Sequence, residues 1–165
     1  MSQKLEITKD IIQKISYLNI ASITPEGMPW NSPVYTSFDA DLNFFWVSWH
    51  KNQHSINIRN NPHVFTTIYD STIPAGTGVG VYMEGKAYEL SNLKETIHAL
   101  KTHYGREKRK PRDVIEFMKK FPRRAYKFVP EKVWVNVDGE VKGNFVDKRV
   151  EVNILELKKR MSTEN

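Results

Sequence analysis

At 165 residues and 19.3 kDa, the chain is long enough for one domain with a proper hydrophobic core. A hydrophobic content of 39% and an aromatic content of 12% exclude a disordered chain, and the lack of cysteine excludes disulfide bonds, thiol catalysis and thiolate metal sites. The net charge of +6 arises from one basic segment, residues 101–124, which holds ten Lys or Arg residues and three acidic ones.

The first fifteen residues contain no uninterrupted apolar run, so they predict neither a signal peptide nor a membrane span, and we expect a cytoplasmic protein without a membrane partner. Thr8 is expected to cap a first helix whose apolar face holds Ile11, Ile12 and Ile15.

Residues 18–24 read as a strand, Pro25-Glu26-Gly27 as a turn, and residues 29–38 as the partner strand. Pro29 and Pro33 each remove a backbone donor, so the partner strand must be irregular or lie at a sheet edge. That edge is either solvated or available to a ligand.

Residues 42–49 are apolar on both alternating faces, which predicts a central, doubly buried strand. Asn52 is then a good N-cap for a short helix over residues 53–59, which Asn60-Asn61-Pro62 ends. The free N–H groups and positive dipole of such a helix start favour an anion, above all a phosphate. A solvated loop followed by a surface helix is the alternative interpretation.

The remaining elements follow in order. Strands are predicted at residues 64–69 and 79–90, joined by a loop at 71–78 that is either a plain connection or a flexible lid. Asn92 with Glu95 forms a capping box for one helix, and Pro111 opens a second helix through Lys120. The chain then returns to strand at 124–129, forms a hairpin of 133–137 with 141–146 through Asp138-Gly139, adds a short strand at 150–152 and ends in a polar tail, 155–165.

These elements predict a mainly β fold with α (α+β), a six- to seven-stranded, mostly antiparallel β-barrel with flanking helices. No linker or repeat divides the chain, so residues 1–165 are expected to form a single domain with a helical insertion at about 92–121.

Several segments carry a family resemblance over residues 18–90. They are residues 20–29 (IASITPEGMP), 31–34 (NSPV), 46–48 (WVS), 54–58 (HSINI) followed by Asn61-Pro62, and 82–87 (YMEGKA). In order and spacing they resemble the pyridoxamine 5'-phosphate oxidase-like family of FMN-binding split barrels.

The resemblance implies a cofactor, FMN, and a homodimer with the flavin at the subunit interface. The strand edge would then suit the edge of the flavin ring, and Trp134 and Asn136 would lie near the partner's flavin. Family members often have Ser-Arg-Lys at the helix start, where this chain has Asn52-Gln53-His54 and therefore less fixed positive charge. The implied cofactor-binding residues are Asn31, Ser32, Pro33, Val34, Ser48, Trp49, Lys51, Gln53, His54, Ser55, Trp134 and Asn136.

The function implied by the resemblance is that of an FMN-binding oxidoreductase acting on a small-molecule substrate by hydride transfer. The chain lacks the C-terminal arginine-histidine motif of the biosynthetic enzymes, so pyridoxamine-phosphate oxidation itself is not expected. The alternatives are a deazaflavin (F420)-dependent reductase and a non-catalytic flavin or haem binding protein, with His50, His54 or His63 as haem ligand.

The basic segment leaves two interpretations open beside that of an ordinary solvated helix. Arg106, Lys108 or Arg109 could attract an anionic substrate at the barrel mouth, or the segment could bind nucleic acid. Its aromatic residues fall at helical core spacing rather than as a stacking platform, so no specific nucleic-acid partner is expected. His50 and His54 lack the further ligands of a metal site, so no metal is expected.

Overall fold

The computed structural model describes residues 3–141 and 144–162, and within them eight strands form one antiparallel sheet. The sheet order is β2-β1-β5-β6-β7-β4-β3, with β8 paired to β7. β2 contacts β4 although the two lie near opposite ends of this order, so the sheet curls into a split barrel. The strands are β1 (Tyr17–Ile23), β2 (Pro29–Tyr35), β3 (Ser37–Phe38), β4 (Phe44–Trp49), β5 (His63–Tyr69), β6 (Gly80–Glu89), β7 (Arg123–Val141) and β8 (Asn144–Val152).

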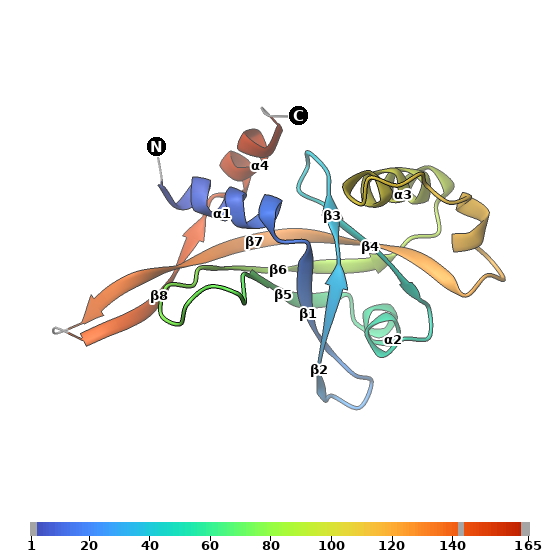
Figure 1. Cartoon of the computed structure of the whole chain (residues 1–165). Coiled ribbons are helices and arrows are strands. Elements are labelled where there is room, and N and C mark those ends of the chain that lie inside the picture. Colours follow the sequence, from blue (N-terminus) through green and yellow to red (C-terminus); the bar gives the residue numbers. More distant parts are fainter. Residues whose placement is uncertain (1–2, 142–143, 163–165) are drawn as a thin grey trace.

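Helices cover the sheet in separate places. α1 (Gln3–Lys14) and α4 (Ile154–Ser162) lie together, α3 (Leu93–Arg106) packs on β4, and α2 (Gln53–Asn60) links β4 to β5 (Figure 1). The β7–β8 hairpin reaches away from these helices beyond the other strands. The predicted α+β barrel class is therefore confirmed.

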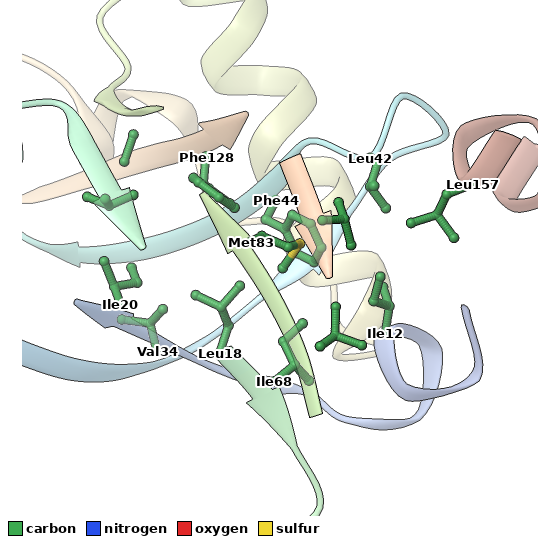
Figure 2. Close-up of a cluster of buried hydrophobic side chains, with 14 of the residues drawn as sticks. Ile12, Leu18, Ile20, Val34, Leu42, Phe44, Ile68, Met83, Phe128 and Leu157 are labelled. Carbon is green, nitrogen blue, oxygen red and sulfur yellow. The ribbon is translucent and has the colours of Figure 1, made fainter. Parts of the chain in front are cut away.

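The main core fills the barrel between α1, α4 and the inner face of the strands. Figure 2 shows Ile12 of α1 and Leu157 of α4 on the same cluster as Leu18, Phe44 and other strand residues. A second, smaller core lies under α3 and contains Phe45, Leu90, Ala99, Leu100, Tyr104, Phe117 and Ala125.

β4 is buried on both faces only in its first half. Phe44 and Trp46 face the main core and Phe45 the second one, as the double apolar pattern predicts. β3 pairs only with Phe44 and Phe45, and Trp49 at the other end is 48% exposed. The prediction of a fully central strand is thus wrong for its last residues. The end of β4 is accessible on the side that β3 does not cover.

A β-bulge allows the long strand β7 to continue through Pro130. The β6–β7 register shifts between Glu84, opposite Lys132, and Gly85, opposite Pro130. A proline without an N–H group is tolerated where the ladder is already interrupted. The two strands predicted before and after Pro130 are therefore one.

The helix boundaries correct three sequence predictions. Thr8 does not cap α1 but lies inside it, with its hydroxyl bonded to the Lys4 carbonyl at 2.7 Å. The helix expected from Pro111 is only a 3-10 turn, η1 (Val114–Phe117), capped by Asp113. The expected polar tail forms α4, because Leu157 and Met161, one helical turn apart, are both buried. Residues 163–165 lie outside the described part.

The hairpin turn also differs from the prediction. Asp138 and Gly139 are paired inside the strands with Asp147 and Val146, and the ladder continues to Val141 opposite Asn144. Residues 142–143, between β7 and β8, lie outside the described residues.

Candidate functional site

Ser48, near the end of β4, is the centre of a small polar cluster. Its hydroxyl accepts a hydrogen bond from Nδ2 of Asn52 at 2.8 Å and lies 2.9 Å from Nε2 of His54. β4 ends at Trp49 and α2 begins at Gln53, so the tight connection between the two brings these side chains together. A hydroxyl, an amide and an imidazole can each hydrogen-bond an anion.

The start of α2 adds backbone donors. Ile56 is the first residue whose N–H bonds back along the helix, to the Asn52 carbonyl at 3.0 Å, so the N–H groups of Gln53, His54 and Ser55 precede the helical ladder. Asn52 is the N-cap, as predicted, but its side chain makes no capping bond and reaches Ser48 instead. Open donors and the positive end of the helix together favour an anion.

His54 is a buried part of this cluster, with 7% of its surface exposed. Burial lowers the pKa of its imidazole, so the ring is neutral at pH 7 in the ligand-free protein. Its ring packs edge-on against Tyr126, with 6.4 Å between centroids. The cluster therefore offers hydrogen bonds but no fixed charge.

Tyr126 of β7 forms the wall behind His54. Its ring stacks on Trp46 at 5.3 Å, and its hydroxyl donates to Oε2 of Glu89 at 3.0 Å. The same carboxylate oxygen accepts from Nη1 of Arg59, in α2, at 2.7 Å. Burial raises the pKa of Tyr126, so the hydroxyl stays a donor. These bonds fix α2 against β6 and β7.

Two predicted ligand side chains of α2 are already engaged inside the protein. The Ser55 hydroxyl donates to the Trp49 carbonyl at 3.0 Å, and Nε2 of Gln53 donates to Oδ1 of Asn57 at 2.9 Å. Lys51 is exposed beside them. For Gln53 and Ser55 the backbone N–H groups, rather than the side chains, are available to a ligand.

The predicted residues of β2 lie at the sheet edge, as the prolines indicated. Asn31 and Pro33 are exposed, Ser32 accepts a bond from Nε1 of Trp30 at 3.0 Å, and the Val34 side chain is in the core. β2 contacts both β4 and α2. The fold therefore brings this edge and the Ser48 cluster together.

Trp134 lies far from Ser48 within one chain. Ser48 pairs with Arg124 on β7, and Trp134 follows ten residues later, roughly 30 Å along an extended strand. The Trp134 ring stacks on Phe65 at 6.2 Å.

Asn136 is further along the same strand and is committed to the loop before β6. Its Nδ2 donates to the Gly78 carbonyl at 3.1 Å, and its Oδ1 accepts from the Gly80 N–H. Trp134 and Asn136 are therefore both separated from the Ser48 cluster of their own chain by the length of β7.

Arg106 has a structural role rather than the predicted attraction of substrate. Its Nη2 donates to the carbonyls of Ile12, Gln13 and Ile15 at 3.2, 2.9 and 3.0 Å, which caps the end of α1. Lys108 remains exposed. Sequence spacing gave no sign that α3 and α1 would meet here.

Two further contacts of the site were not predicted. Asn52 was predicted as a helix cap and as part of the helix start, but not as a partner of Ser48, although the spacing of four residues is a local signal. Tyr126 was not predicted, since its place opposite Trp46 depends on the pairing of β4 with the distant β7.

The histidines do not gather into a metal centre. His63 is exposed at the start of β5, and His54 is bonded to Ser48. In residues 3–141 and 144–162, no three His, Cys, Asp or Glu side chains lie together so as to hold a metal ion. No helix in these ranges is long and apolar enough to cross a membrane.

The sequence itself decides the family. Residues 6–136, more than half of the chain, match the profile of a family described as pyridoxamine 5'-phosphate oxidase. The chain belongs to the pyridoxamine 5'-phosphate oxidase family. No curated protein matches the chain.

Solved structures share the fold of this family member. A haem binding protein from Mycobacterium smegmatis matches with a TM-score of 0.71 at 13% identity, over 96% of this chain and 61% of that one. A conserved hypothetical protein from Mycobacterium tuberculosis gives 0.64 at 22% identity, over 81% and 82%. An F420 reductase gives 0.55 at 16% identity, over 76% and 94%. At these identities the likeness shows the split-barrel fold alone.

Proposed function

We propose that this member of the pyridoxamine 5'-phosphate oxidase family binds FMN and acts as an oxidoreductase, with the flavin phosphate at the start of α2. The observation that carries the proposal is the set of open N–H groups at Gln53 and His54 beside the Ser48 hydroxyl. A phosphate there would satisfy donors that the helix leaves free.

These residues fit a phosphate by hydrogen bonding more than by charge. Neutral donors and the helix dipole favour an anion, but the buried His54 ring is uncharged before the ligand binds. A dianion beside the ring would favour its protonated form, so we expect FMN binding to be accompanied by proton uptake.

The bound flavin would supply hydride transfer. The chain's own residues would bind the flavin and orient it. The outer edge of β2 carries backbone groups without a neighbouring strand in the described residues, and Val34 anchors that strand in the core. Trp49 presents an exposed apolar ring at the end of β4.

We further infer a homodimer in which Trp134 and Asn136 lie near the partner's flavin. The separation along β7 supports it, because a shared site must draw Ser48 and Trp134 from different chains. Phe65 and Trp134 also face away from the core, on the side opposite their neighbours Val64 and Val135. We expect a small-molecule substrate, as the family resemblance implies. We also expect a cytoplasmic location, with which a chain without cysteine is consistent.

The test is a titration of FMN against the wild type, Ser48→Ala and His54→Ala, with His63→Ala as an exposed control. Loss of one charge-assisted hydrogen bond of about 1.5–3 kcal/mol should raise the Kd of His54→Ala at least about tenfold at pH 6, and less at pH 8. The control should bind like the wild type. A His54→Ala variant with unchanged Kd at both pH values would remove His54 from the site.

A further inference from the structure

A cavity of about 740 Å³ lies beside the Ser48 cluster. Its walls are the end of β4, the C-terminal end of α3 and the start of β7, and Ser48, Trp49 and Asn52 line one side. The cavity therefore adjoins the place proposed for the flavin phosphate.

Three arginines also line the cavity, namely Arg109, Arg112 and Arg123. The guanidinium of Arg109 lies over the Tyr104 ring, 5.9 Å from its centroid. Burial raises the pKa of Tyr104, and the charges of all three arginines act against that rise. Arg109 is thus in contact with the phenol ring, and Arg112 and Arg123 are near enough to act on it electrostatically.

The cavity wall carries more positive than negative charge. Glu107 is the acidic residue that lines it, and this carboxylate is bonded to Nη1 of Arg109 at 3.1 Å. Arg112 pairs with Glu116, which is not among the lining residues. Arg123 forms no ion pair within the described residues. An anion in the cavity would balance the excess.

A buried histidine also lines the cavity. His103 lines the cavity with only 6% of its surface exposed, and its Nε2 lies 3.4 Å from Oε1 of Glu107. Its Nδ1 forms no hydrogen bond of normal geometry, although the Phe45 carbonyl lies close enough to favour the charged ring.

Regular structure holds part of the cavity wall. The β4–β7 ladder sets Arg123 opposite Trp49, and the His50 N–H donates to the Pro122 carbonyl at 3.0 Å. Tyr104 packs against Phe117 of η1 under α3. The β4–β7 ladder thus sets Arg123, whereas Arg109 and Arg112 lie in the segment that joins α3 to η1.

We propose that the flavin phosphate held at the start of α2 lies at the edge of this cavity, and that Arg109, Arg112 and Arg123 supply from the cavity the positive charge that the start of α2 lacks. Neutral donors alone balance a dianion poorly, whereas guanidinium groups bind phosphate oxygens in pairs. The helical insertion between β6 and β7 is then part of the cofactor site. This inference rests on the proposed binding of FMN.

The experiment compares FMN with riboflavin, which has the same ring system and no phosphate. The variant carries Arg109→Gln, Arg112→Gln and Arg123→Gln, and the control carries the same loss of charge at three exposed lysines that do not line the cavity, Lys101→Gln, Lys108→Gln and Lys110→Gln. We expect the arginine variant to bind FMN at least about tenfold more weakly, with riboflavin unchanged, and the lysine control to bind both like the wild type.

Two other results are informative. FMN binding that is equal in the arginine variant and the wild type, with both folded by circular dichroism, would overturn the role of the arginines while leaving the proposed function intact. If the wild type binds neither flavin, the proposed function fails. In that case the arginines are tested with inorganic phosphate, whose ³¹P signal broadens when it binds to the protein. Broadening by the wild type but not by the arginine variant would support an anion site at the arginines. Equal broadening by both proteins, or none, would overturn the anion site.

Discussion

At the scale of single residues, the candidate site depends on neutral donors in buried places. His54 sits under Tyr126 with Nε2 at the Ser48 hydroxyl, and burial keeps its ring uncharged. Exposed Lys51 is the nearest basic side chain along the sequence. The positive charge of the region therefore comes from residues distant in sequence, above all the arginines near Tyr104.

The buried histidines should make stability depend on pH. Burial lowers the folded-state pKa of His54 and His103 below the ordinary value of 6.5, so the unfolded chain binds more protons as the pH falls. Their contribution is present above about pH 6.5 and is lost as the pH falls from there through the lowered folded-state pKa. We expect the free energy of unfolding, from urea denaturation, to be smaller at pH 5 than at pH 7.5.

Substitution separates this effect from general acid sensitivity. His54→Gln should show a smaller loss of stability between pH 7.5 and pH 5 than the wild type, whereas exposed His63→Gln should lose as much as the wild type. An identical loss in His54→Gln and the wild type would mean that His54 is not the group that titrates.

At the scale of elements, the β6–β7 bulge makes one glycine irreplaceable. A Cβ on Gly85 would lie 2.1 Å from the Val129 carbonyl oxygen, a backbone atom that cannot move aside without breaking the ladder. Gly85→Ala should cost roughly 3 kcal/mol or more of the free energy of unfolding.

A second glycine gives the matched control. Gly105 lies in α3, and a Cβ there would meet no atom within 4 Å. Gly105→Ala should stabilise the protein by about 0.5–1 kcal/mol, because alanine is the better helix former. Denaturant titrations that found the two variants equally stable would contradict the close approach at Gly85.

Elements that are stabilised by hydrogen bonds between residues near in sequence could be predicted from the sequence. The Asn92 cap is real, with Oδ1 accepting from the Lys94 and Glu95 N–H groups at 2.9 and 3.2 Å. The Pro25-Glu26-Gly27 turn is likewise set by its own residues, with Gly27 at a φ of 86°. Elements decided by packing were harder to predict. Nothing local shows that Leu157 will bury against α1 or that Asp138-Gly139 will continue a strand.

The candidate site likewise has one part that could be predicted from the sequence and one part that could not. The helix start and its cap could be predicted because they follow β4 directly in sequence. Arg112, Arg123 and Tyr126 could not, because only the register of β7 against β4 and the packing of α3 bring them to Ser48. Sequence spacing does not encode pairings between such distant segments.

At the scale of the whole molecule, the proposed dimer predicts that each flavin site contains His54 from one chain and Trp134 from the other. His54→Ala and Trp134→Ala should each weaken FMN binding, because each chain lends one of these residues to a different site. When the two variants are mixed and allowed to exchange subunits, half of the mixed dimer's sites regain both wild-type residues. We expect titration of the mixture to recover a tight phase.

Sedimentation provides the companion measurement. The wild type should sediment as a dimer at micromolar concentration. A monomer that still binds FMN, or a mixture without a tight phase, would contradict the shared site and place the flavin within one chain.

The central claim is that the polar cluster at the start of α2 holds the phosphate of FMN. Its most direct test is the absorbance spectrum of the freshly purified protein, followed by identification of the released chromophore. We predict the bands of an oxidised flavin, bleaching on reduction, and FMN in the released fraction. A haem spectrum, a deazaflavin, or a colourless protein that gains no flavin bands on titration with FMN would contradict the account.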